Sequence, residues 1–250
     1  MPTKYLYCRS ADRTLGTSSA YVVQLSETFR SITSASLVAA ELAFSWYNIA
    51  TPYTAGVRFT HNAVTWDATL TPGFYAVDDL RTALLSGLQV AFPTAGITAV
   101  TYSATTGKLS IVYTSGLTFS VQSTSAGLLG RVVGTDPLGT ATLASAGALT
   151  FPGVANLSAS TSSIFVRIGE LPSLTSSTNQ QHAFARLQLS AAPGSIVMAN
   201  NASGVVNSNP YTTPIPSLTS LSVSLYSVDG YAIDLHGTEW AMTLMFQCAA

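Results

Sequence analysis

Apolar residues recur with helical spacing in residues 71–92. Steps of three and four place these side chains on one face of a predicted α-helix: Val77, Leu80, Leu84, Leu88 and Ala91. Pro72 and Gly73 predict a turn before the helix, and Pro93 predicts its end. We interpret the apolar stripe as facing a core rather than a partner. That core must be β-structure, because strands are predicted on both sides of the helix.

Most of the remaining chain alternates apolar and small polar residues, which is typical of half-buried strands. Strand pairs are predicted next to the helix, at residues 57–70 and 99–121. Further strands are predicted at residues 4–9, 21–25, 36–49, 148–151, 163–171, 183–189, 195–198, 221–225, 231–235 and 240–246. Residues 174–181 and 200–216 are polar, and we predict surface loops there.

Composition narrows the classes of function. Only 8% of the residues are charged, the net charge is -1 and 47% are hydrophobic, which excludes a disordered, charge-rich chain. A surface of Ser, Thr, Ala and Gly with so few charges is typical of a protein whose surface is largely buried against partner proteins. The 10 basic residues are spread singly, so we expect no specific nucleic-acid binding. We also expect no membrane span and synthesis in the cytosol, because no long apolar run or signal peptide is found.

The sequence predicts no catalytic site, no metal and no cofactor. The histidines lack the spacing of metal ligands. Asp229, Asp234 and Glu239 are close in sequence, as in a cation site or a glycosidase carboxylate pair. A hairpin turn accounts better for Asp229, and solvent-facing strand ends for the other two. The chain also has no nucleophile elbow and no phosphate-binding glycine loop. We therefore expect a protein that is not an enzyme.

The two cysteines, Cys8 and Cys248, lie near the two ends of the chain on predicted strands. Pairing of the terminal strands would bring them closer together. Two buried free thiols are nevertheless the simpler interpretation for a protein of a reducing compartment.

Motifs in three parts of the chain occur in a recognisable order. The opening pattern S-x-D-R-T-x-G-T contains Ser10, Asp12, Arg13, Thr14, Gly16 and Thr17. The middle patterns P-G-x-Y-T-x-x-E-L, T-G-K-L and L-L-G contain Pro72, Gly73, Tyr75, Leu80, Gly107, Lys108, Leu129 and Gly130. The final pattern, which runs from S-L-Y to G-T-E-W, contains Asp229, Gly230 and Trp240.

These motifs resemble the penton or minor capsid proteins, the single jelly-roll proteins of virophages, polinton-like viruses and some large eukaryotic DNA viruses. The sequence departs from the family pattern twice. Ala76 replaces the usual Ser or Thr and so removes a helix-capping side chain, at a cost of about 1 kcal/mol. Arg131 replaces the usual aromatic residue and changes one packing contact.

The predicted fold class is all-β. We expect a jelly-roll sandwich of two antiparallel sheets, with about eight main strands. The jelly-roll domain comprises residues 1–55 and 136–250. Residues 56–135 form a small α+β unit with one helix, which either is inserted into the sandwich or covers one sheet. We prefer the insertion.

The resemblance implies a structural function in the virion. The first hypothesis is a homopentameric penton, the vertex protein that closes icosahedral five-fold axes beside the major capsid protein. A minor capsid or cement protein at another position, in contact with other minor capsid proteins, is an alternative. A second alternative is a jelly-roll glycan-binding module that uses the predicted loops at residues 174–181 and 200–216.

Asp12 and Arg13 are the strongest candidates for a constrained pair of charges, since the chain has few charges and these two are adjacent. They either cross-link their turn to a neighbouring strand of the same chain or face an adjacent subunit. A guanidinium suits both roles, because it grips carboxylates and carbonyls with planar geometry. We prefer the intramolecular role.

Overall fold

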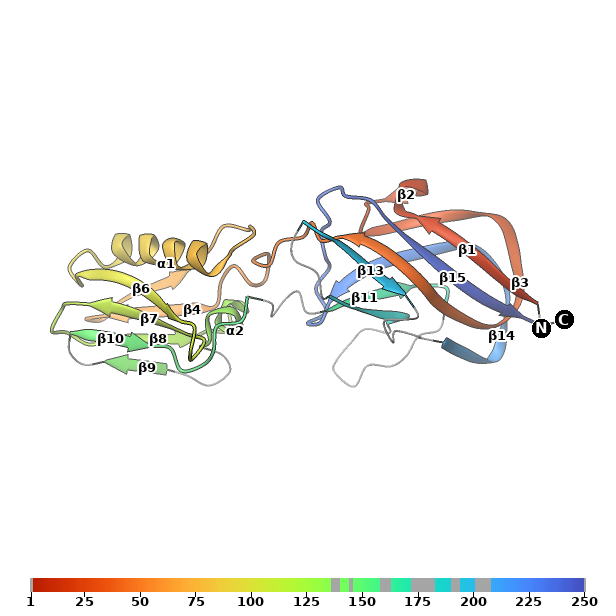
Figure 1. The fold of residues 1–250 in the computed structure, drawn as a ribbon. Helices are drawn as coiled ribbons and strands as arrows, with labels where there is room; N and C mark the ends of the chain where they lie inside the picture. The colour runs from red at the N-terminus through yellow and green to blue at the C-terminus, as the bar shows by residue number, and fades with distance from the viewer. Residues whose placement is uncertain are drawn as a thin grey trace. The chain divides into compact units, whose positions relative to one another are not determined.

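The structure is a computed structural model of the chain. It describes residues 2–135, 140–143, 146–157, 163–171, 183–189, 194–200 and 208–249. The chain forms two compact units (Figure 1). Unit 1 comprises Met1–Trp46 and Thr161–Ala250, and unit 2 comprises Tyr47–Ser160.

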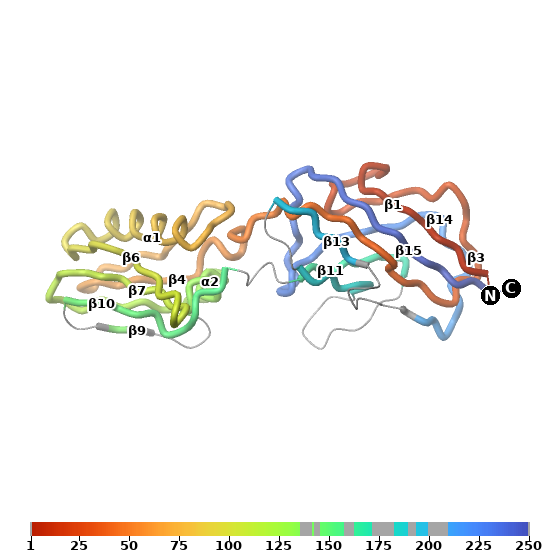
Figure 2. The backbone as a smooth tube through the Cα atoms, in the orientation of Figure 1, coloured from red at the N-terminus to blue at the C-terminus, as the bar shows by residue number. Residues whose placement is uncertain are grey.

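Unit 1 is an antiparallel jelly roll, which confirms the predicted fold class. Its strands follow the order β1-β15-β3-β14-β11-β12, and β2 and β13 also pair with β3. The strands are β1 (Thr3–Arg9), β2 (Leu15–Gly16), β3 (Ala20–Ala43), β11 (Ser163–Ile168), β12 (Ala185–Gln188), β13 (Ile196–Asn200), β14 (Ser208–Ser227) and β15 (Trp240–Cys248). Figure 2 shows β1 in red beside β15 in blue, so the two ends of the chain meet in one sheet.

Strand β3 is the reason why the sandwich is one continuous sheet and not the two separate sheets that we expected. This single strand joins the strands predicted at residues 21–25 and 36–49, and it ends at Ala43. It pairs with β14 along its first part and with β15 and β13 along its last part. Ser31, with φ of 51°, and shifts in register mark the bend between the two parts. Bending of this kind lets one strand belong to both layers.

The core of unit 1 lies between these layers. Alternate side chains of the long strands point inward and are buried, as Leu221, Val223 and Leu225 of β14 show. Phe29 of β3 packs against Phe246 of β15, with 5.0 Å between the ring centroids. Residues from β3 and from the last strand, β15, therefore share one core.

Unit 2 contains two further antiparallel sheets, ordered β10-β7-β6 and β5-β4-β8-β9. Its elements are β4 (Val57–His61), β5 (Val64–Ala68), α1 (Val77–Ala91), β6 (Ile97–Ser103), β7 (Lys108–Tyr113), β8 (Phe119–Ser123), α2 (Leu129–Val133), β9 (Thr140–Leu143) and β10 (Gly147–Thr150). Unit 2 extends beyond residues 56–135, because Ile49, Tyr53 and Phe151 belong to its core. The short helix α2 was not predicted from the spacing of apolar residues.

Helix α1 has the predicted apolar face, with Leu80, Leu84 and Leu88 buried in the core of unit 2. Its start lacks a capping side chain, because residue 76 is alanine. The carboxylate of Asp79 accepts a hydrogen bond from the Ala76 amide over 3.1 Å, which satisfies one of the free amides of the first turn. Among the described residues, no helix is long and apolar enough to cross a membrane.

The C-terminal half contains two corrections. The loop predicted at residues 200–216 is wrong for residues 208–216, which lie in β14, while residues 201–207 are outside the described residues. The prolines favoured a loop in the prediction, because proline has no amide to donate to a neighbouring strand. In the structure the pairing with β3 shifts register between Pro210 and Ile215, so a proline there removes no regular hydrogen bond of the sheet. The strand predicted at residues 231–235 is reduced to one bridge, between Tyr226 and Ala232.

Both cysteine thiols are free and buried. The terminal strands do pair, but Cys8 faces Met242 while Cys248 lies at the other end of β15. Antiparallel pairing thus separates the two thiols instead of joining them. Burial is the main cause that raises the pKa of Cys8, and a raised pKa keeps a thiol protonated and unreactive.

Candidate functional site

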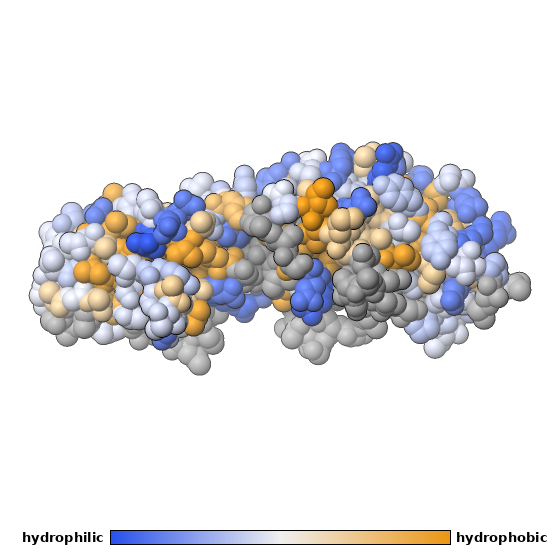
Figure 3. Space-filling view, in the orientation of Figure 1, coloured by the Kyte–Doolittle hydropathy of each residue, from blue (hydrophilic) through white to orange (hydrophobic). Residues whose placement is uncertain are grey.

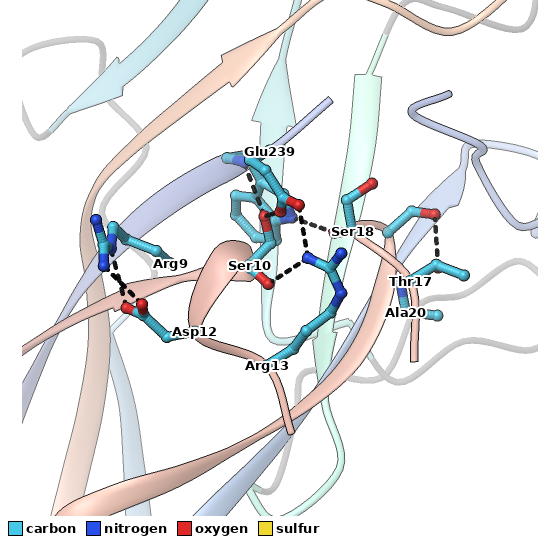
Figure 4. A network of polar contacts seen from close by, with 10 residues as sticks. Arg9, Ser10, Asp12, Arg13, Thr17, Ser18, Ala20 and Glu239 are labelled. Carbon is cyan, nitrogen blue, oxygen red and sulfur yellow. Dashed lines mark hydrogen bonds and ion pairs between the residues drawn. The ribbon is translucent and has the colours of Figure 1, made fainter. Parts of the chain in front are cut away.

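The opening and final sequence motifs meet in unit 1 (Figure 4). Arg13 follows the short 3-10 helix η1 (Ser10–Asp12), and Glu239 precedes β15. The Arg13 guanidinium forms an ion pair with Glu239, with 2.6 Å between Nη1 and Oε1. The same Nη1 donates to the backbone carbonyl of Ser10 over 2.8 Å. The guanidinium therefore ties its own turn to the start of the last strand.

Ser10 and Trp240 form further, buried hydrogen bonds next to this ion pair. The fully buried Ser10 hydroxyl donates to the Glu239 carboxylate and accepts a hydrogen bond from the Trp240 amide over 2.9 Å. The indole Nε1 of Trp240 donates to the carbonyl of Ser18 over 2.8 Å. The ring also meets Tyr21 edge-on, at 6.1 Å between centroids. We call these residues the terminal clamp: Ser10, Arg13, Ser18, Glu239 and Trp240.

The terminal clamp makes Glu239 sensitive to acid. The hydrogen bond from Ser10, and then that from Arg13, lower the pKa of Glu239 below its ordinary value of 4.5. A carboxyl group whose pKa is lowered in the folded state stabilises the fold at any pH above its ordinary, unfolded-state pKa. That stabilisation is lost as the pH falls through the folded-state pKa.

We expect Glu239→Gln to make unit 1 less stable than the wild type at pH 7. The deficit should shrink as the pH falls below 4.5, because the wild-type carboxylate then becomes protonated. Urea unfolding of both proteins at several pH values between 7 and 3 measures this convergence. A deficit that stays constant across this range would contradict the role given to the carboxylate.

Asp12 and Arg13 do not pair with each other. Asp12 binds Arg9 through two hydrogen bonds, of 2.6 Å and 2.9 Å, and these bonds lower the pKa of Asp12. Both side chains of this pair are about half exposed, so the pair contributes little to stability. Arg13 instead reaches Glu239 of the same chain, which is an intramolecular cross-link of the kind that we preferred.

Thr14, Gly16 and Thr17 shape the turn that carries the clamp. The Thr14 amide donates to Val22, and the Thr17 amide donates to Ala20, each over 2.8 Å. Gly16 has φ of 98°, and a Cβ atom at this position would lie 2.1 Å from the Ala20 carbonyl oxygen. Only glycine allows this approach without a shift of the backbone.

The middle motifs lie in unit 2 and serve its packing. Gly73, next to Pro72, forms a backbone bridge with Ile49 through bonds of 2.8 Å and 3.2 Å. The Asn48 side chain holds both the amide and the carbonyl of Tyr75, over 2.9 Å and 2.8 Å. These contacts fix the entry into α1, whose first buried residue is Leu80.

The remaining candidate residues of unit 2 are two glycines and their neighbours. Gly107 turns between β6 and β7 with φ of 67°, and the Lys108 ammonium donates to the carbonyl of Pro152 over 2.7 Å. Leu129 is buried, and a Cβ atom at Gly130 would lie 2.2 Å from the Ser123 hydroxyl. The left-handed backbone conformation explains Gly107, and close packing explains Gly130.

Asp229 and Gly230 form the turn after β14. Gly230 has φ of 82°, and its amide donates to the carbonyl of Ser227 over 3.0 Å. The turn thus explains the glycine of this motif.

Sequence reasoning missed Glu239 as a site residue and assigned it to a solvent-facing strand end. Its place next to Trp240 in the final motif was a signal. Its partner, however, is 226 residues away in the sequence. In the described part of the chain, no group of three or more His, Cys, Asp or Glu residues is arranged to hold a metal ion. The terminal clamp has the geometry of a structural cross-link, because its polar groups form hydrogen bonds with one another.

The comparison with solved structures agrees with this fold. No protein-family model matches the chain, and no curated protein matches it by sequence. Among solved structures, the chain is similar to the crystal structure of the SeMet-labeled mavirus penton protein, with a TM-score of 0.51 and 13% sequence identity. The alignment covers 100% of both chains. The fold is penton-like. At this level of identity the likeness is one of fold, and it includes both units.

Proposed function

We propose that this chain is a structural capsid protein, a penton that closes the five-fold axes of an icosahedral shell. The observation that carries the proposal is the match to the mavirus penton protein over the whole length of both chains. The order of the sequence motifs supports the same assignment. We place the protein in the virion, with copies of itself and the major capsid protein as partners.

The surface composition supports an assembled state. The chain carries 10 basic and 11 acidic residues in 250, and interfaces are depleted in charged residues at their centres. The glycan-binding alternative is weaker, because residues 208–216 of one of its two loops belong to β14. The other loop, at residues 174–181, lies outside the described residues.

Mass photometry and native mass spectrometry of the purified protein test the proposal. We expect a species of five times the 26.0 kDa mass of one chain, with no larger open polymer. Co-expression with the major capsid protein of the same virus should place the chain at the vertices of reconstituted shells in electron micrographs.

Other outcomes would overturn the assignment as a penton. A stable trimer found between capsomers would favour a minor capsid or cement protein. A monomer that shells do not incorporate, and that is retained on a glycan array, would favour the glycan-binding module.

A further inference from the structure

Three charged side chains of unit 1 stand out because they have no polar partner among the residues that the structure describes. Nearly all charged side chains of the described residues form ion pairs or hydrogen bonds. The exceptions within the described ranges are Arg30, Glu41 and Arg167. In a chain with so few charges, two arginines and one carboxylate left without partners indicate contacts that a single copy does not make.

Glu41 lies on an apolar outer surface of the sandwich. Its strand neighbours in the register are Ala241 of β15 and Met198 of β13. Met198 is 67% exposed and Ile196 is 66% exposed, although both are large apolar residues. We call the surface formed by Tyr5, Tyr7, Glu41, Ile196 and Met198 the β13 face. Figure 3 shows apolar residues gathered over β13.

The β13 face contains a groove of about 330 Å³ at Glu41. Its walls include Arg9, Ile196 and Trp240. The Arg9 side chain is already bound to Asp12. Within the described ranges the carboxylate of Glu41 therefore has no partner and can receive a cationic side chain, and Ile196 offers apolar contact to the aliphatic part of that side chain.

Arg167 lies on the other side of the sandwich. It belongs to β11, where it faces Ser224 of β14, and the neighbouring pair in the register is Phe165 with Tyr226. Both of these aromatic side chains are half-buried. We call the surface formed by Phe165, Arg167, Arg186 and Tyr226 the β11 face.

The two faces point away from one shared core. Leu42 and Val197, which alternate with Glu41 and Met198, are buried in it. Val166, which precedes Arg167, is buried in the same core. An aromatic and cationic face therefore lies on one side of the sandwich, and an apolar face with the Glu41 carboxylate lies on the other.

Resting on the proposed function, we propose that the β13 face of one copy binds the β11 face of the next copy, with Arg167 in the groove beside Glu41. Contact between two β13 faces would place like charges together, which opposes a symmetric dimer. Contact between different faces is heterologous, and repeated contacts of this kind close into a ring only when the rotation between neighbouring copies fits the ring. Arg30 is the weaker candidate for the groove, because it adjoins Ser31 at the bend of β3, outside both faces.

Charge reversal tests this interface. We expect Glu41→Arg and Arg167→Glu each to raise the protein concentration needed for half-maximal assembly by about tenfold or more. Mass photometry across a dilution series measures this concentration. The double variant Glu41→Arg/Arg167→Glu should recover most of the lost affinity, because each copy then offers the swapped pair. Arg30→Glu is the matched control and should assemble like the wild type. Circular dichroism should show that all four variants keep the wild-type thermal transition, since these side chains are solvent-facing.

The outcomes separate this proposal from the proposed function. A wild-type pentamer that both single reversals leave unchanged, or a double variant no better than the single variants, would overturn the interface and leave the penton assignment intact. Loss of assembly in Arg30→Glu but not in Arg167→Glu would also overturn it. A wild-type chain that neither assembles alone nor enters reconstituted shells would overturn the penton assignment itself.

Discussion

Replacing Trp240 by alanine is expected to lower the free energy of unfolding of unit 1 by about 4 kcal/mol. Trp240 is only 3% exposed, and its ring packs against Tyr21. The substitution leaves a cavity of nearly the whole indole, and it also leaves the buried carbonyl of Ser18 without its donor. It therefore removes the indole contacts of the terminal clamp, while the amide of residue 240 can still donate to Ser10.

Urea unfolding followed by circular dichroism, together with hydrogen exchange of peptides from β1, β3 and β15, measures this loss. Exchange assigns the change to unit 1, which matters because two units need not unfold together. Trp240→Phe is the matched control. It keeps most of the apolar ring and lacks the N–H donor, so a smaller loss of about 1–2 kcal/mol is expected. An alanine variant that loses less than the phenylalanine variant would refute the account of the clamp.

Gly16→Ala is expected to destabilise unit 1 by about 3 kcal/mol, at the upper end of the cost of a strained backbone position. An alanine with φ of 98° is itself strained. In addition, its methyl group would overlap the backbone carbonyl of Ala20, which no side-chain rotation can relieve. The turn must shift, and the paired bonds of Thr14 with Val22 and of Thr17 with Ala20 weaken.

Gly237→Ala separates the two causes. Gly237 has φ of 78°, but a Cβ atom there meets no atom within 4 Å. Its replacement should cost only the backbone strain, about 1 kcal/mol. Equal losses in the two variants, compared by urea unfolding under the same conditions, would show that the close approach at Gly16 contributes nothing.

The spacing of apolar residues predicted the helices and strands that bury one face of a single continuous segment. Helix α1 was predictable because Leu80, Leu84 and Leu88 repeat at helical spacing and prolines lie on both sides. Strand β15 was predictable because Met242, Leu244 and Phe246 alternate with smaller or more polar residues. In both cases one face of a single element meets the core.

Long-range features were not predictable in the same way. The pairing of Arg13 with Glu239 joins residues 226 positions apart, and only the topology brings them together. The continuity of β3 was hidden because residues 26–34 are largely polar and do not alternate clearly. The start of β14 was hidden by prolines, which argue against a strand unless the pairing is irregular at that point.

The pairing of β1 with β15 also determines when each unit can be completed during translation. All the residues of unit 2 have been synthesised by Ser160, well before the last strand of unit 1 exists. Unit 1 holds β1 and β3 from the start of the chain and must keep them unpaired with β15 until Cys248 has left the ribosome. The edges of β1 and β3 therefore wait longer for their partner strand than any edge of unit 2 does.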